Sequence, residues 1–164
     1  MAKRRAEGGG GTPATVTLTS LGIPFTPRSY RHDPSVTAFG LEAAAALGVD
    51  PPRVLKTLLA EVDGSLVVAI VPVTDQLDLK ALATALGGKR ATMADPAVAE
   101  RKTGYVVGGI SPIGQRTTLP TVLDESAFEH ETVLVSGGRR GFDLELAPSD
   151  LGSAVSAVVA RIAR

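Results

Sequence analysis

The spacing of apolar residues predicts a chain of alternating helices and strands. Thr12 and Pro13 form a helix-start pattern, since threonine caps a first turn and proline fits its first position, and Gly22 marks the end. Ala14 and Leu18 then share one face of this helix. The same stretch also alternates as a strand would, but the end signals favour the helix.

A β-hairpin is predicted in the middle of the chain. Residues 54–62 and 65–73 are apolar runs of strand length, and Asp63-Gly64 between them is a strong two-residue turn signal. Further strands are expected at 25–30, 121–123, 132–135 and 142–146, with a turn at 137–141, and helices at 41–47, 79–86, from 95 to about 104, and from 148 onward.

Two segments carry a more specific expectation. Pro27 cannot donate a backbone hydrogen bond, so its strand is expected at a sheet edge. The last helix is expected to continue through Ile162, because Leu151, Val155, Val158 and Ile162 share one helical face. Hairpins require antiparallel pairs, while helices cross over between other strands. The element order therefore predicts an α+β fold with a single mixed, largely antiparallel sheet and flanking helices.

Length and composition suit one domain with an aliphatic core. The chain has 164 residues, of which 44% are hydrophobic and only 4% aromatic, with no tryptophan. The core is therefore expected to consist of valine, leucine, isoleucine and alanine. Residues 1–11 end in four glycines and are expected to form a flexible tail, followed by one domain at 12–164.

The charges argue against a broad nucleic-acid-binding surface. The net charge is zero, and it is −2 once the first twelve residues are left out. We expect no DNA binding, and any RNA contact must come from a local patch of basic residues. No apolar run is long enough to span a membrane, and no signal peptide is visible. These features, with the absence of cysteine, fit a cytoplasmic protein without a membrane partner.

The same counts exclude several kinds of catalytic site. Without cysteine there is no disulfide, thiolate metal site or cysteine nucleophile. His32 and His130 are too few for an ordinary zinc site, so no metal or cofactor is expected. No serine-hydrolase elbow occurs. Asp143 and Glu145 alternate on a predicted strand, which is more typical of a solvated face than of an acid–base pair.

Lys56 is the first candidate for chemistry, because it interrupts an otherwise apolar strand. On a strand it shares a face with Val54 and Leu58. A lysine on a buried face costs free energy unless it is paired or faces a cleft. The alternative is an edge-strand lysine that blocks aggregation.

Three further segments could contact a ligand, and each also has a simpler structural explanation. The glycine-rich stretch 104–114 could bring bare backbone N–H groups to a ligand, or be a tight loop that matches no nucleotide-binding motif. Ser136 and the arginines at 139–140 could contact substrate and phosphate, or form a hairpin turn. His32-Asp33 could be functional, or could simply make a turn.

Taken together, these segments resemble the YbaK/EbsC family, free-standing relatives of the editing domain inserted in bacterial prolyl-tRNA synthetases. The resemblance covers nearly the whole chain from Thr12 to the last predicted helix, and is most similar to the Cys-tRNA(Pro) deacylase branch. It rests on segments that occur in the family's order and spacing: Tyr30, His32-Asp33-Pro34, Phe39-Gly40, Lys56-Thr57-Leu58-Leu59, Gln76-Leu77-Asp78-Leu79-Lys80, Met93-Ala94-Asp95-Pro96, Thr103-Gly104-Tyr105, Val107-Gly108-Gly109-Ile110-Ser111-Pro112, Gly114-Gln115, Ser136-Gly137-Gly138 and Arg140-Gly141.

The resemblance implies a site as well as a fold. Carried over by position, Lys56 is the family's essential lysine, and Gly108 offers its backbone N–H; these two are the expected catalytic residues. The residues expected to bind substrate are Tyr30, Phe39, Thr57, Gly109, Ile110 and Ser136.

The resemblance further implies a trans-editing hydrolase that removes cysteine from tRNA(Pro) and acts beside prolyl-tRNA synthetase. Members of this branch are expected to use neither a metal nor a protein nucleophile. The sulfur of the cysteine attacks the carbonyl carbon of the same cysteine, and the cysteine leaves the tRNA as a cyclic thiolactone. Two alternatives stay open. One is an Ala-tRNA(Pro) deacylase of the same fold, and the other is a non-catalytic module that binds tRNA or a synthetase.

Overall fold

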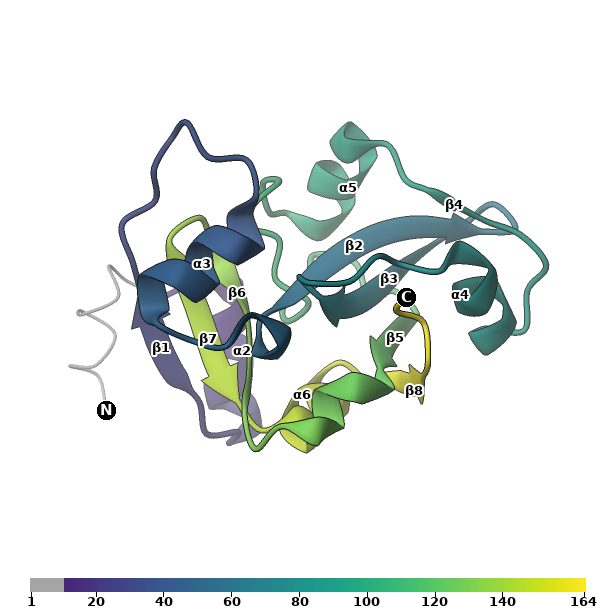
Figure 1. Cartoon of the computed structure of the whole chain (residues 1–164). Helices are drawn as coiled ribbons and strands as arrows, with labels where there is room; N and C mark the ends of the chain where they lie inside the picture. The colour runs from purple at the N-terminus through teal and green to yellow at the C-terminus, as the bar shows by residue number, and fades with distance from the viewer. Residues whose placement is uncertain (1–10) are drawn as a thin grey trace.

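The computed structural model describes residues 11–164, so residues 1–10 of the expected tail lie outside the described part of the chain. Figure 1 shows its helices and strands. The strands are β1 (Thr26–Ser29), β2 (Leu55–Val62), β3 (Ser65–Pro72), β4 (Ala91–Met93), β5 (Thr121–Asp124), β6 (Val133–Arg139), β7 (Phe142–Leu146) and β8 (Val158–Ala160). The helices are α2 (Pro13–Leu21), α3 (Phe39–Leu47), α4 (Leu79–Ala85), α5 (Pro96–Thr103) and α6 (Pro148–Ala154), with 3-10 helices η1 (Pro51–Arg53) and η2 (Glu125–Glu129).

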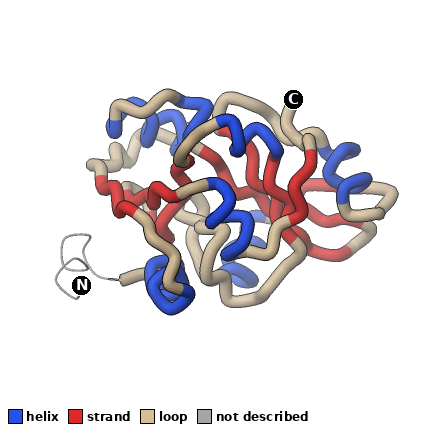
Figure 2. The backbone as a smooth tube through the Cα atoms, turned by 90° about the horizontal axis from the view of Figure 1, so that it is seen from below, coloured by secondary structure: helices blue, strands red, loops and turns tan. Residues whose placement is uncertain are grey.

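The strands form two sheets, which lie side by side in Figure 1 and are seen from below in Figure 2. One sheet has the order β1-β7-β6, and the other β4-β2-β3-β5-β8. The pairs β3–β5 and β5–β8 are parallel and the other strand pairs are antiparallel. The α+β class and the mixed strand directions are therefore confirmed. The expected single sheet is instead divided, with one isolated bridge between Val54 and Leu134 linking its two parts.

Local signals placed the first helix and the hairpin correctly. The Thr12 hydroxyl accepts the Thr15 N–H and the Thr15 hydroxyl accepts the Thr12 N–H, so α2 begins with a reciprocal cap. Asp63 and Gly64 have φ of 50° and 85°, as a tight hairpin turn requires. Pro27 lies in β1, which is an edge strand as expected.

The C-terminal helix is shorter than expected. It ends at Ala154, and the chain then turns at Ser156, whose φ of 51° is left-handed, into strand β8. Two adjacent β-branched residues favour a strand here, and β8 pairs with β5. The buried Asp124 carboxylate fixes the end of the chain by accepting the Ile162 and Ala163 N–H groups, both at 2.8 Å.

Two other boundaries differ from expectation. Strand β4 was not expected, because three residues are too short to show a clear alternation. The turn expected at 137–141 is confined to Arg140-Gly141, and β6 continues to Arg139 through an irregularity in register between Ser136 and Arg139. Glycine at 137–138 therefore marks a bulged strand rather than the turn itself.

Burial on both faces explains why β3 is a nearly continuous apolar run. Val68 and Ile70 point into a core shared with α2, α6 and the three-stranded sheet. Val67, Ala69 and Val71 point to the opposite face, where α4 covers the sheet. Successive side chains of a strand alternate between its faces, so both sets can be buried at once.

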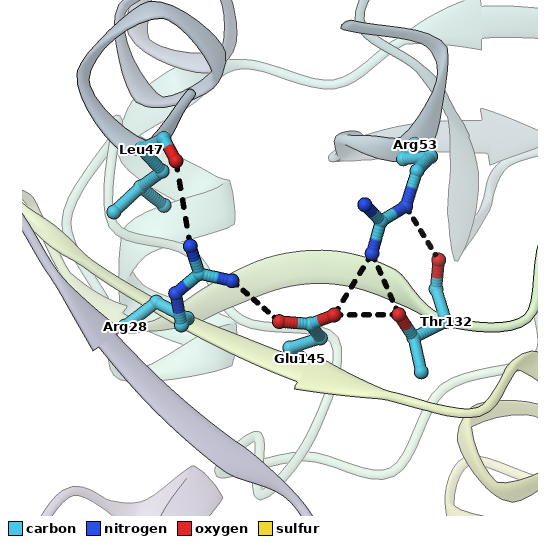
Figure 3. Close-up of polar contacts among 5 residues, drawn as sticks. All are labelled: Arg28, Leu47, Arg53, Thr132 and Glu145. Atoms are coloured by element: carbon cyan, nitrogen blue, oxygen red, sulfur yellow. Dashed lines mark hydrogen bonds and ion pairs between the residues drawn. The ribbon is translucent and has the colours of Figure 1, made fainter. Parts of the chain in front are cut away.

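A polar network fixes η1 and α3 to the three-stranded sheet (Figure 3). The Glu145 carboxylate on β7 pairs with Arg28 of β1 at 2.5 Å and with Arg53 of η1 at 2.8 Å. Arg53 and Glu145 both bond the Thr132 hydroxyl, and Arg28 also donates to the Leu47 carbonyl at the end of α3. β2 begins two residues after η1. The network therefore also fixes the start of β2 beside the three-stranded sheet.

Candidate active site

A cleft of about 450 Å³ lies where β2 separates from the three-stranded sheet. Its size is within the usual range for sites that bind small molecules. The wall on β2 consists of consecutive residues, which means that the cleft runs along an open strand edge. Its lining comes mainly from five regions: 54–59 of β2 and its approach; 37–41 at the start of α3; Met93, Ala94, Pro96 and Ala99 at the end of β4 and in α5; Val107, Gly108 and Ile110 of the glycine-rich loop; and Tyr30, Ser136 and Asp143 beside the three-stranded sheet.

Lys56 faces this cleft. β2 is an inner strand, but its neighbour β4 pairs only with Ala60–Val62, so no strand of the described residues pairs with the Lys56 end of β2 on that side. The side chain is half-buried and makes no ion pair or hydrogen bond with a described residue. Lys56 thus lies at an unpaired edge of β2 that is also a wall of the cleft, where it can contact a ligand as well as protect the edge.

The Thr57 hydroxyl has an unusual environment. Its Oγ1 is buried but has no hydrogen-bond partner among the described residues. An unpaired buried hydroxyl costs about 1–3 kcal/mol, a cost that a polar ligand group removes on binding. Thr57 also lines the cleft, next to Lys56.

The glycine-rich loop presents Gly108 to the same cleft. Gly108 has φ of 90°, and a Cβ there would lie 2.9 Å from the Phe39 ring. Its N–H makes no hydrogen bond with a described residue, so it is a free donor. The Val107 peptide before it is held from both sides, because Glu100 accepts its N–H at 2.8 Å and Arg140 donates to its carbonyl at 2.9 and 2.6 Å.

Gly109 and Ile110 differ in their placement. Ile110 lines the cleft, whereas Gly109 is buried and is not part of the lining. A Cβ on Gly109 would lie 2.7 Å from the Arg139 backbone, so this glycine allows the loop to pack on the end of β6. Seven of the eight residues expected at the site therefore meet in one cleft, and Gly109 supports it from behind.

Two aromatic residues form the wall opposite β2. Phe39 lies at the start of α3, with the His32 ring 5.7 Å from its centroid and the Arg140 guanidinium 5.1 Å away. Tyr30 follows β1; burial raises the pKa of its phenol to about 12, and the nearby Asp143 carboxylate adds to this shift. His32 bonds Glu42 at 2.8 Å, and Asp33 caps a turn through Ser35, so this pair makes a turn that borders the site.

Asp143 corrects an expectation from the sequence, which took Asp143 and Glu145 to lie on a solvated face. It lies on β7, is only 6% exposed and lines the cleft. Its cross-strand neighbour on β6 is Ser136. Burial raises the pKa of its carboxyl from 3.8 to about 7, although Arg28 on the neighbouring strand opposes part of the shift. No described residue donates a hydrogen bond to it, so a cationic ligand group would find a buried, uncompensated partner there. The run 142–146 holds two alternating acidic residues, Asp143 and Glu145, and alternation alone does not show what covers their face.

The described residues contain neither a membrane-spanning helix nor a cluster of metal-ligating side chains. Between residues 11 and 164 no helix is long and apolar enough to cross a membrane. That part of the chain also contains no group of three or more histidine or acidic side chains placed to hold a metal ion.

Comparison with known proteins identifies the family. The family model described as "Aminoacyl-tRNA editing domain" matches residues 33–153, and the chain belongs to this family. It is 40% identical over 120 residues to a protein of Enterococcus faecalis named "Putative Cys-tRNA(Pro)/Cys-tRNA(Cys) deacylase EbsC", covering 73% of each chain.

Two other similarities bear on the function. Over 78 residues the chain is 38% identical to the "Multifunctional Ser/Thr-tRNA deacylase ProXp-y" of Escherichia coli K12, covering 45% of this chain and 47% of the relative. A solved structure described as "a putative trans-editing enzyme for prolyl tRNA synthetase" superimposes with a TM-score of 0.80 at 25% identity, covering 93% of this chain and 95% of the other. The family resemblance expected from the sequence is therefore confirmed.

Proposed function

We propose that residues 12–164 form an aminoacyl-tRNA deacylase domain that hydrolyses the ester between a wrong amino acid and the terminal ribose of a tRNA. The observation that carries this proposal is the convergence of Lys56, Gly108 and Asp143 on one cleft. A cation and a free N–H suit the developing charge on an ester carbonyl oxygen, and a buried carboxylate suits the α-ammonium group of an amino acid.

Each group has a separate part in this reaction. Asp143 binds the α-ammonium group and so orients the aminoacyl end. The Gly108 N–H donates to the carbonyl oxygen as it becomes negative, and Lys56 stabilises the same charge or the terminal nucleotide beside it. The Thr57 and Ser136 hydroxyls bind the remaining polar groups, while Tyr30, Phe39 and Ile110 limit the size of the side chain that fits.

Cysteine is the proposed amino acid, and its own thiol is the proposed nucleophile. The sulfur forms a bond to the carbonyl carbon, the bond from that carbon to the ribose oxygen breaks, and the thiol proton ends on the ribose oxygen. The products are a cyclic thiolactone and a tRNA with a free ribose hydroxyl. Holding the thiol near its carbonyl gives the large effective concentration of an intramolecular reaction, worth about 7–11 kcal/mol in the best cases.

The proposed partners are tRNA(Pro) and prolyl-tRNA synthetase, in the cytoplasm. A synthetase pocket distinguishes cysteine poorly from proline, because apolar pockets separate side chains of similar size by only about 10–200-fold. The net charge of zero suggests weak binding of free tRNA, so we expect the synthetase to strengthen productive capture.

The unpaired Thr57 hydroxyl favours a second candidate, a deacylase for seryl- or threonyl-tRNA. A hydroxyl in the cleft can bond a hydroxyl of the substrate side chain, and a site built in this way rejects analogues that lack it. The relative in Escherichia coli carries a name with this specificity.

One assay separates these candidates. Purified protein is incubated with Cys-tRNA(Pro), Ser-tRNA, Thr-tRNA and Ala-tRNA(Pro), and products of a quenched reaction are identified by mass spectrometry. We expect cysteinyl ester to be cleaved fastest and thiolactone to appear first. Free cysteine without thiolactone at early times refutes the substrate-assisted mechanism. Faster cleavage of Ser-tRNA favours the second candidate. If none of the esters is cleaved, the proposed deacylase activity is refuted.

A further inference from the structure

Four basic side chains gather outside the cleft, around the glycine-rich loop. We call Arg101, Lys102, Arg116 and Arg140 the basic rim; all four are exposed. The first two lie in the last turn of α5, and Arg116 lies against this turn, since its Nη1 donates to the Arg101 carbonyl at 3.2 Å. Arg140 reaches the same loop from the β6–β7 turn through the carbonyl of Val107.

No ion pair with a described residue neutralises this rim. The acidic residue in the stretch, Glu100, is occupied by the Val107 N–H. Arg101 and Lys102 gain some stability from the helix C-terminus, about 0.3–1 kcal/mol each. Arg116 lies outside the helix, and its charge adds repulsion to theirs. Arg116 and Arg140 also bond backbone carbonyls, so these contacts position the rim while leaving its positive charges without a carboxylate partner among the described residues.

The rim adjoins the cleft without lining it. α5 contributes Pro96 and Ala99 to the cleft, and the loop contributes Val107 and Gly108, whereas no rim residue is part of the lining. A ligand whose reactive end lies in the cleft and whose body extends past α5 and the glycine-rich loop would meet the rim. In an aminoacylated RNA, the first phosphate is the 5′-phosphate of the same terminal nucleotide, so negative charge begins close to the ester.

We propose that the basic rim binds the phosphates of the RNA 3′ strand whose aminoacylated end occupies the cleft. This inference rests on the proposed deacylase function and adds the surface that holds the RNA. The stretch around η2 is acidic by contrast, since Glu125, Glu129 and Glu131 follow one another there without an intervening Lys or Arg. On a chain without net charge, a local basic patch attracts a polyanion toward that patch.

The chemistry of the rim favours RNA over a protein partner. Guanidinium groups bind phosphate oxygens through two parallel hydrogen bonds, and three of the four rim residues are arginines. Protein interfaces have an apolar centre. In the loop beside the rim, the large exposed apolar side chain is Val106, and a single valine does not form such a centre.

The test compares a tRNA ester with a small ester. The rim variant carries Arg101→Gln, Lys102→Gln and Arg116→Gln. The matched control loses the same three positive charges at exposed residues away from the rim, through Lys80→Gln, Lys89→Gln and Arg90→Gln. The parent and both variants are assayed on Cys-tRNA(Pro), with and without prolyl-tRNA synthetase, and on 3′-cysteinyl adenosine. Binding of uncharged tRNA(Pro) is measured by fluorescence anisotropy over a range of salt concentrations.

We expect the rim variant to bind tRNA about tenfold more weakly or worse, with a log–log salt slope reduced by about 2–3, since each lost phosphate contact removes about one. Its kcat/KM should fall at least fivefold more on tRNA than on the small ester, and the control should match the parent. Equal losses on both esters, or unchanged tRNA binding, overturn the proposal, and a loss only in the presence of prolyl-tRNA synthetase identifies a protein contact instead.

The outcomes also distinguish a failure of the basic-rim proposal from a failure of the proposed deacylase function. If the parent cleaves neither ester, the deacylase proposal fails, while the anisotropy measurement still tests the rim. If the parent cleaves both and the rim variant binds tRNA equally well, the rim proposal alone fails. Thermal melting checks folding, and Lys102→Gln and Arg116→Gln as single changes replace the triple variant if it does not fold.

Discussion

At the scale of single residues, Asp143 has the most unusual environment in the cleft. Its carboxyl is buried and lacks a described hydrogen-bond donor, and burial raises its pKa to about 7. A group that binds the α-ammonium must be ionised, so its charge state changes within the physiological range. The same burial makes the ionised form costly for the folded protein.

We predict that Asp143→Asn lowers kcat/KM for Cys-tRNA(Pro) and removes a pH dependence. Below pH of about 7 the carboxyl of the parent is protonated and loses its attraction for the ammonium group, so kcat/KM should fall as pH falls. The variant lacks this group and should have no acid limb near that pH. A parent profile that is flat between pH 5.5 and 8 contradicts the role.

The same variant should be more stable at pH 8. Between pH 3.8 and about 7 the folded protein binds more protons at Asp143 than the unfolded chain does, so its contribution to stability is lost as pH rises through this window. The asparagine side chain of the variant cannot ionise, and we expect a gain of about 1–3 kcal/mol at pH 8 and little change at pH 4. Urea unfolding of both proteins at the two pH values measures this difference.

Lys56 differs from Asp143 because nothing in the fold depends on it. It is half-buried and without a described partner. We predict that Lys56→Ala keeps the melting temperature within a few degrees and lowers deacylation by about 10²–10³-fold, the usual loss when one group that stabilises an oxyanion is removed. Lys80→Ala, on the exposed side of α4, is the control. Parent-like activity in a folded Lys56→Ala protein excludes a catalytic role.

At the scale of elements, the glycine-rich loop serves both substrate and fold, at different positions. A Cβ on Gly108 would meet the Phe39 ring and the Arg140 side chain, which can move, whereas a Cβ on Gly114 would lie 2.5 Å from the Pro13 carbonyl, which cannot. Both residues have positive φ, so the backbone strain is similar.

We therefore predict opposite effects of the two alanine substitutions. Gly108→Ala should lower activity at least tenfold, because it displaces the free N–H, with a modest change in melting temperature. Gly114→Ala should lower the melting temperature more and retain more activity per folded molecule. Activity and thermal melting are measured on both variants, and the reverse pattern would assign Gly108 to folding.

At the scale of the whole molecule, the cleft exists because two sheets diverge from one place. Glu145 holds β1, β7 and η1 together there (Figure 3). We predict that Glu145→Ala lowers the free energy of unfolding by about 1–3 kcal/mol, since it leaves Arg28 and Arg53 partly buried without their partner. The exposed Glu125→Ala should change it by less than about 0.5 kcal/mol. Denaturant unfolding measures both, and equal effects contradict the importance of the network.

Much of the fold could be predicted where the signal is local. Caps, a two-residue turn and apolar runs indicated α2, the β2–β3 hairpin and the edge position of β1. The prediction failed at residues 155–160, since their helical pattern competes with pairing to β5, a partner far earlier in the chain. The expected single sheet was wrong for a similar reason, because short-range patterns do not show which strands become neighbours.

The candidate site divides in the same way. The sequence by itself identified Lys56 as a candidate, because a lysine in an apolar run costs free energy unless it is paired or faces a cleft. It also identified the glycine-rich loop by its composition. The family resemblance supplied the other expected positions. Only the tertiary structure decided that these residues share a cleft, that Asp143 is buried in it, and that four basic residues adjoin it. Alternation along a strand shows which residues share a face, but what covers that face depends on segments that are distant in the chain.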